Sequence, residues 1–194
     1  MARKLLLTLL VLGGLAAVGG AATYSAFSGQ TTNTSNSFTA GTVQLADNDV
    51  GAAMLSLTNA QPGASDTSCI HVTYSGSLSS TVRLYGAVAG TLAPYLTLTV
   101  TRGDDPTPVF DDCTGFVADP ADYIGSGSGV IYQGALSGFP STYALGLVDP
   151  VAASPETWTN PESHTYRFAV TLANDNAAQG QSATASFSWE ARNQ

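Results

Sequence analysis

Apolar and polar side chains alternate along much of the chain after residue 38, and no segment keeps the 3.6-residue period of a helix. Alternation with a period of two is typical of strands that bury one face. Residues 164–172 show this pattern most clearly. It places four apolar side chains on one face, Tyr166, Phe168, Val170 and Leu172, and three polar side chains on the other, Thr165, Arg167 and Thr171.

Residues 183–190 repeat the pattern, with Ala185, Phe187 and Trp189 on the predicted inner face. A loop rich in Asn, Asp and Gly, residues 174–180, separates these two strands. About eight strands are enough for an antiparallel β-sandwich, so we expect an all-β domain. The six earlier segments with strand character are residues 38–45, 53–57, 69–74, 81–88, 95–101 and 130–133.

Two segments of the second half differ from this pattern. Residues 140–147 are a candidate for a short helix. Residues 125–129 form a Gly/Ser loop, which lacks the lysine and the following helix that a phosphate-binding loop requires. We therefore expect no phosphate site in this loop.

The first 26 residues have the pattern of a secretory signal peptide. Arg3 and Lys4 precede an uncharged stretch, residues 5–22, that is rich in Leu, Val, Ala and Gly. Cleavage after Ala22 fits the small-residue rule better than cleavage after Ala26. An uncleaved membrane anchor is the alternative, because 18 residues reach the lower limit for a spanning helix. Four glycines within the stretch argue against that alternative.

The charge of the exported chain limits its partners. From Phe27 onward the chain has 168 residues, with four arginines, no lysine and fourteen acidic side chains, a net charge of −10. Such a surface repels nucleic acid and anionic lipid, so we expect no nucleic-acid partner and membrane contact only through an uncleaved leader. The length is typical of one domain, which we place at residues 38–194. The expected location is the extracellular matrix or the cell surface.

Cys69 and Cys113 are the two cysteines of the chain. In an exported protein such a pair predicts one disulfide. It would close a loop of about 44 residues and stabilise the fold by about 3–4 kcal/mol. A metal site is disfavoured, because neither cysteine has a second Cys or His at ligand spacing.

Catalytic motifs are missing from the sequence. It contains neither an H-E-x-x-H pair nor a G-x-S-x-G elbow. His71 and His164 stand alone on predicted strands, and Trp158 and Trp189 read as core residues of a sandwich. We therefore expect a protein that is not an enzyme.

Calcium is the one cofactor that the sequence suggests. Carboxylate oxygens at high density can bind this ion. The main group of aspartates lies at residues 104–112, and Asp47 with Asp49 forms a second, smaller group. The spacing matches no EF-hand loop, and Pro106 and Pro108 interrupt the main group. The alternative is a solvated loop of turns without a cofactor. The candidate ligands are Asp104, Asp105, Asp111 and Asp112.

Two blocks, one at each end of the chain, carry a family resemblance. The first joins the leader end Gly-Ala-Ala-Thr-Tyr-Ser-Ala-Phe-Ser, residues 20–28, to Asn-Ser-Phe-Thr-Ala-Gly-Thr-Val-Gln-Leu, residues 36–45, with the turn Pro62-Gly63 after them. The second runs through Trp158, Glu162, Tyr166-Arg167-Phe168, Thr171-Leu172, Gln179-Gly180 and Phe187-Ser188-Trp189-Glu190-Ala191. Together they resemble the TasA/camelysin family of secreted, fibre-forming matrix proteins, while residues 76–155 match no motif of it.

The resemblance implies a jelly-roll sandwich, a leader removed by a dedicated signal peptidase, and an N-terminal arm, residues 27–37, that completes the sheet of the next subunit. An arm rich in Thr and Ser and free of Pro can add main-chain hydrogen bonds to an open sheet edge. The expected first strand is seated by Phe38, Val43 and Leu45. The expected donor residues are Phe27, Ser28, Gln30, Thr31, Thr32, Asn33, Thr34 and Asn36.

The function expected from these observations is that of a secreted subunit that polymerises head-to-tail into extracellular fibres or pilus-like filaments of a biofilm matrix or surface adhesin. The partners would be identical subunits and a possible initiator or anchoring protein. A monomeric, secreted cation- or glycan-binding module is the alternative. The protease activity associated with camelysin is a third, less favoured reading, because no residue of this sequence has a recognisable role in peptide hydrolysis.

Overall fold

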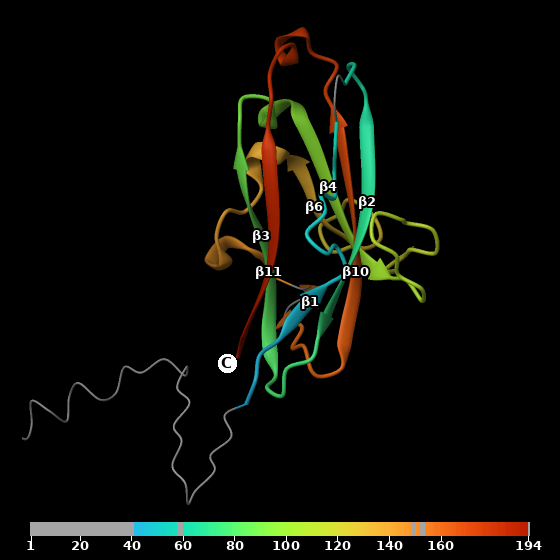
Figure 1. Cartoon of the computed structure of the whole chain (residues 1–194), viewed down its shortest axis with the longest axis vertical. Helices are drawn as coiled ribbons and strands as arrows, with labels where there is room; N and C mark the ends of the chain where they lie inside the picture. The colour runs from blue at the N-terminus through green and yellow to red at the C-terminus, as the bar shows by residue number, and fades with distance from the viewer. Residues whose placement is uncertain (1–40, 58–59, 149, 152–153, 194) are drawn as a thin grey trace, which may run out of the picture. The chain divides into compact units, whose positions relative to one another are not determined.

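The computed structural model describes residues 41–57, 60–148, 150–151 and 154–193 (Figure 1). From Gly41 onward these residues form one compact unit. The predicted signal peptide, the donor arm and Phe38 lie outside the described residues. No helix in the described ranges is long and apolar enough to cross a membrane.

The domain is an antiparallel β-sandwich, as predicted. Its larger sheet has the strand order β1-β2-β10-β4-β5, with β6 also paired to β4, and its smaller sheet has the order β11-β3-β7. A short hairpin, β8 and β9, adds to these layers. The strands are β1 (Leu45–Asp47), β2 (Ser65–Tyr74), β3 (Ser80–Ala89), β4 (Leu96–Asp104), β5 (Val117–Ala118), β6 (Val130–Ala135), β7 (Leu147–Val148), β8 (Pro150–Val151), β9 (Ser154–Pro155), β10 (Glu162–Leu172) and β11 (Thr184–Asn193).

Strand β10 is the centre of the larger sheet. It pairs with β2 on one side and with β4 on the other, in registers that set Phe168 opposite Ser68 and Val100. Its four predicted inner residues are all buried, because they face the smaller sheet across the core. Burial of one such side chain contributes about 1.5–3 kcal/mol, so β10 organises the core.

The smaller sheet closes the other side of the core. Strands β3 and β11 pair along their whole lengths, with Leu84 opposite Trp189. Val82 and Leu84 of β3 are buried, whereas Phe187 and Trp189 of β11 are only partly buried. Strand β11, beside β3 in Figure 1, is therefore an edge strand, and its inner side chains Phe187 and Trp189 are incompletely covered.

Helical structure in the described residues is limited to four 3₁₀ turns. The candidate helix at 140–147 is one such turn followed by strand β7, because the backbone leaves the turn at Gly146, with ψ of 149°, after two hydrogen bonds. The turns are η1 (Ala93–Tyr95), η2 (Leu136–Gly138), η3 (Tyr143–Leu145) and η4 (Asn176–Ala178).

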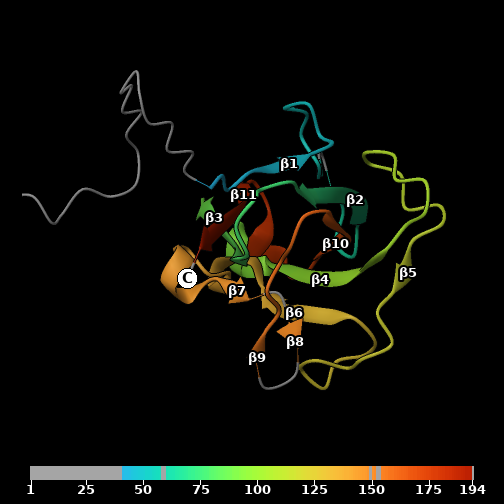
Figure 2. The same cartoon turned by 90° about the horizontal axis from the view of Figure 1, so that it is seen from below.

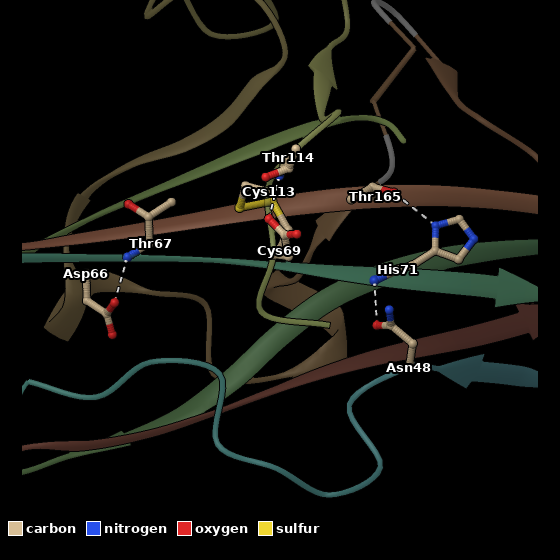
Figure 3. Close-up of a disulfide and its surroundings, with 9 residues drawn as sticks. Asn48, Asp66, Thr67, Cys69, His71, Cys113, Thr114 and Thr165 are labelled. Carbon is tan, nitrogen blue, oxygen red and sulfur yellow. Dashed lines mark hydrogen bonds between the residues drawn. A yellow bond between two sulfur atoms is a disulfide. The ribbon is translucent and has the colours of Figure 1, made fainter. Parts of the chain in front are cut away.

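The predicted disulfide between Cys69 and Cys113 is present (Figure 3). It ties β2 to an excursion of the chain between β4 and β6, which we call the acidic loop (residues 104–129). The Asp111 N–H also donates to the Cys69 carbonyl at 3.0 Å. The acidic loop is therefore fixed against the outer face of the larger sheet.

Two sequence expectations were wrong in detail. Among the described residues the first strand begins at Leu45, and Val43 lies before it, 39% exposed. Residues 53–57 form no strand, because their backbone lies beside β2 without a ladder. Thr165 lies on the predicted polar face of β10 and is nevertheless 1% exposed, because His71 packs beside it and bonds to its hydroxyl.

Candidate functional site

A cavity opens between the two sheets. It measures about 340 Å³ and lies along the inner face of β11. Its floor is the apolar core, with Ile70, Leu98 and Val170 exposed to it from the larger sheet. A smaller hollow continues between β1 and β11, bordered by Leu45 and Phe187. We call this cavity and its extension the groove.

The wall opposite β11 is a segment that we call the strap (residues 52–57). Met54, Leu55 and Leu57 pack their side chains against the core. One side-chain hydrogen bond, from the Ser56 N–H to Asp66 at 2.7 Å, holds the strap to β2. The alternation of apolar and polar residues that predicted a strand here thus reflects side chains that cover the core. The strap itself pairs with no strand in the described part of the chain.

The two sheet edges beside the groove differ in how they are protected. On β2 the Thr67 and His71 N–H groups donate to the side chains of Asp66 and Asn48 (Figure 3). The Cys69 carbonyl accepts from Asp111. Strand β11 pairs with β3, and within the described residues no other segment makes a backbone hydrogen bond with residues 184–193. Of these two edges, β11 is therefore the one left open by the described residues.

An unpaired donor also lies in the groove wall. The Trp189 indole N–H is buried and has no hydrogen-bond acceptor within the described residues. Trp189 packs against Tyr166 and Phe168, with ring centroids 5.3 and 5.9 Å away. A buried donor of this kind normally finds a partner, so an arriving carbonyl at this position would satisfy it.

Two aspartates lie at one end of the groove. Asp47 and Asp49 both line it, and the Asp49 N–H donates to the Asp47 carboxylate. Burial raises the pKa of Asp47 above 3.8, the usual value for an aspartate, and the side chain and charge of Asp49 raise it further, while the hydrogen bond from the Asp49 N–H opposes the shift. Binding of an apolar segment at this end of the groove is therefore favoured when the Asp47 carboxyl group is protonated.

A second cluster lies around the buried side chain of Arg102. Its guanidinium donates to Asp119 and to Glu156, each at 2.5 Å, and lies 2.8 Å from Nε2 of His164. Tyr123 donates to the same Asp119 carboxylate. The pairing of a buried guanidinium with two carboxylates is a structural feature that fixes this end of the sandwich.

His164 is the one predicted lone histidine that gains carboxylate neighbours. Glu156, Glu162 and His164 place ligand atoms within 4.8 Å of one another, which is close enough for a metal ion. The Arg102 guanidinium already lies among these groups and supplies positive charge there. The indole of Trp158 packs against the His164 ring with centroids 4.8 Å apart. The arrangement therefore suits an internal charge cluster better than an open metal site.

The four calcium candidates of the acidic loop are not gathered at one point. Asp105 is buried and accepts from the Thr107 N–H, while Asp112 accepts from Thr114. Asp104 and Asp111 are exposed, and Asp111 has a positive φ of 67°. Within the described part of the chain, these residues form no group of three ligand atoms at metal-binding distances. They serve mainly to shape the turns of the acidic loop.

His71, the other predicted lone histidine, lies on the outer face of the larger sheet. Its Nδ1 is 2.9 Å from the Thr165 hydroxyl (Figure 3). Burial lowers the pKa of His71, and the nearby charge of Asp105 opposes this effect. The neutral ring serves as a cover for Thr165.

Sequence reasoning named some residues of the groove and missed others. It placed Phe187 and Trp189 on an inner face and Leu45 on the first strand, and the structure brings these three to the smaller hollow. It did not predict that Asp47 and Asp49 would border the groove, nor that Arg102 would meet Glu156. Those contacts depend on strand register between segments that are distant in sequence, for which the sequence holds no local signal.

No protein-family model matches this chain, and no curated protein sequence matches it.

Proposed function

We propose that the protein is a secreted structural subunit that polymerises head-to-tail by donor-strand complementation. The N-terminal arm of one copy, residues 27–37, would enter the groove of the next copy and pair with the free edge of β11. The resulting fibres would contribute to a biofilm matrix or to surface adhesion, as the resemblance to the TasA/camelysin family also implies. The single observation that carries the proposal is an edge strand without a second partner in the described part of the chain, beside an apolar groove.

The physical argument starts from the exposed edge. An unpaired strand edge is a template for another strand, and native proteins usually protect it with charge, proline or a covering segment. The groove side of β11 presents Ala185, Phe187 and Trp189 and no charged side chain. An extended segment that pairs with β11 gains main-chain hydrogen bonds there and places alternate side chains over the core.

The arm must also supply an apolar side chain that fills the groove. A cavity of about 340 Å³ is more than twice the size of an engineered ~150 Å³ cavity that stays dry and binds benzene. Within residues 27–36 the one large apolar side chain is Phe27, and the remaining residues are small or polar. Phe27 would therefore be the anchor of the arm, while Thr and Ser residues provide the paired backbone.

The contact is heterologous, because the arm and the groove are different surfaces of the same chain. A heterologous contact that does not close into a ring propagates into a filament. Secretion agrees with the disulfide, which is stable outside the reducing cytosol. The proposed polymerisation thus combines a donor, the N-terminal arm, with an acceptor edge, strand β11, near the other end of the chain.

The first test deletes residues 27–36 from the mature chain. Filaments seen by negative-stain electron microscopy should disappear, while circular dichroism should show an unchanged β-sandwich. Filaments that survive the deletion would exclude the arm as donor. Folded monomers at every concentration, with or without the deletion, would instead favour a monomeric binding module.

The second test blocks the acceptor. Ala185 is exposed on the groove side of β11, so Ala185→Phe should fill the groove and prevent arm entry. Ala87→Phe is the matched control, because Ala87 is exposed on the neighbouring strand β3 and faces away from the groove. Equal assembly of the two variants would contradict the proposed acceptor.

A further inference from the structure

The two outer faces of the sandwich differ in charge. The acidic loop lies on the outer face of the larger sheet and exposes Asp104, Asp111, Asp112 and Asp122. On the outer face of the smaller sheet lie two of the four arginines of the described residues, Arg83 and Arg192, and neither contacts the acidic loop. Figure 2 shows β5, within the acidic loop, and β7, within the smaller sheet, on opposite sides of the domain.

The arginines of the smaller sheet form a compact cluster around an aromatic ring. The Arg192 guanidinium lies 3.8 Å from the centroid of Tyr143, and that of Arg83 lies 5.2 Å from it. Arg83 also donates to the Ala144 carbonyl at 3.0 Å, which fixes η3 on the sheet. Leu145 beside them is 69% exposed. We call Arg83, Tyr143, Leu145 and Arg192 the arginine patch.

Arg192 is the most accessible cation of this patch. Its side chain is 57% exposed, and its Nε donates to Glu190 at 2.7 Å. Among the described residues no group bonds to its two terminal nitrogens, so they are open to a carboxylate from outside. Glu190 also accepts from Tyr85, and these hydrogen bonds lower the pKa of Glu190. The two arginines and the one glutamate leave the cluster with a net positive charge.

The acidic loop carries the complementary features. Its four exposed aspartates stand among exposed apolar side chains, Val109 at 61% and Val117 at 67%. The hydrogen bonds from Thr114 lower the pKa of Asp112, so its carboxylate is ionised at neutral pH. The disulfide holds the loop in place, so its charges are presented on a fixed surface.

We propose that the arginine patch binds the acidic loop of a second copy of this chain, which joins subunits side by side. The contact pairs Arg192 and Arg83 with aspartates of the partner copy and places Leu145 against its exposed valines. It uses neither the groove nor the N-terminal arm. It therefore goes beyond the proposed polymerisation and would bundle filaments laterally.

Charge complementarity supports a second copy as the partner. The exported chain has a net charge of −10, so two copies repel each other except where opposite charges face. Arg and aromatic residues are enriched at the centres of protein interfaces, and charge pairing sets their register. Because the two surfaces lie on opposite outer faces, the contact is heterologous and can repeat from copy to copy.

The test measures self-association in a chain whose groove is blocked. The mature chain carrying Ala185→Phe is analysed by sedimentation velocity at low and at high ionic strength. We expect association at low salt that weakens at high salt, because screening reduces contacts between exposed charges. In this background Arg192→Gln should weaken association about tenfold, the effect of roughly 1.4 kcal/mol. Gln61→Glu is the matched control, since it makes the same change in net charge at an exposed position elsewhere.

A mixing experiment tests whether the two surfaces meet. Arg192→Glu makes the patch acidic, and Val109→Arg with Val117→Arg adds positive charge to the acidic loop without removing its turn-forming aspartates. Each variant alone should associate more weakly than the parent, and an equal mixture should regain association. A mixture that stays monomeric, or an Arg192→Gln variant that associates like the control, would overturn the proposal. Filaments in the blocked chain would contradict the groove assignment instead, so the two failures are distinguishable.

Discussion

The Phe187 ring of edge strand β11 lies 4.7 Å from the Phe168 ring of central strand β10, centroid to centroid. Phe168 is fully buried, and Phe187 also contacts Phe139 in an edge-to-face arrangement at 5.2 Å. These contacts join the open edge of the smaller sheet to the centre of the larger one. The acceptor edge is thereby held in position, although β3 is its only strand partner within the described residues.

Phe187→Ala should destabilise the domain by about 2–4 kcal/mol, because it removes aromatic contacts and enlarges the groove. Urea unfolding followed by tryptophan fluorescence measures the loss. Ser188→Ala, at the next and exposed position of β11, should change stability by no more than about 0.5 kcal/mol. Similar values for the two variants would contradict the role of Phe187 in joining the sheets.

Arg102→Met should cost about 3–5 kcal/mol, since it leaves the carboxylates of Asp119 and Glu156 without their buried cation. Arg167→Met removes an arginine that stacks on Phe116 at 5.0 Å and should cost much less. Chemical denaturation of both variants compares the losses. An Arg102 variant as stable as the Arg167 variant would refute the proposed structural role of the cluster.

Reduction of the Cys69–Cys113 bond should lower the free energy of unfolding by about 3–4 kcal/mol, because the unfolded chain loses its cross-link. The Cys69→Ser, Cys113→Ser double variant should show a similar loss without reductant. Urea midpoints with and without reductant provide the measurement. A midpoint that does not move would indicate that the acidic loop is held by other contacts.

Asp47→Asn should stabilise the domain at neutral pH. The folded state raises the pKa of Asp47, so it holds that proton more tightly than the unfolded state does, and stability falls as pH rises above 3.8. An asparagine cannot ionise and avoids this loss. Urea unfolding should therefore show an advantage of the variant at pH 7 that vanishes below pH 3.8. An advantage of equal size at both pH values would disprove the titration argument.

The sequence predicted the long strands because each has a strict two-residue period. The predicted strand 164–172 lies within β10, and the predicted strand 183–190 corresponds to β11. In both strands the predicted inner faces point toward the core. The same rule failed at residues 53–57. Met54, Leu55 and Leu57 do contact the core, but the strap makes no ladder, and periodicity alone does not distinguish these two cases.

The charge clusters were beyond sequence reasoning for a different reason. Arg102 lies 54 residues before Glu156 and 62 before His164. The pairing of β4 with β10 brings Arg102 and His164 together. The open edge of β11 also depends on sheet order, which follows from the whole topology. The local alternation of residues thus predicts individual strands, whereas the register and order of the paired strands determine which residues meet in the candidate site.

Hydrogen exchange of the β11 amides, residues 184–193, tests the central claim most directly. The claim is that this edge accepts the arm of another subunit. In filaments the amides on the free side of β11 should exchange more slowly than in monomers, because they would donate to the arm. The chain lacking residues 27–36 should keep monomer-like exchange at the same concentration. Filaments whose β11 amides exchange as fast as those of the monomer would contradict the account.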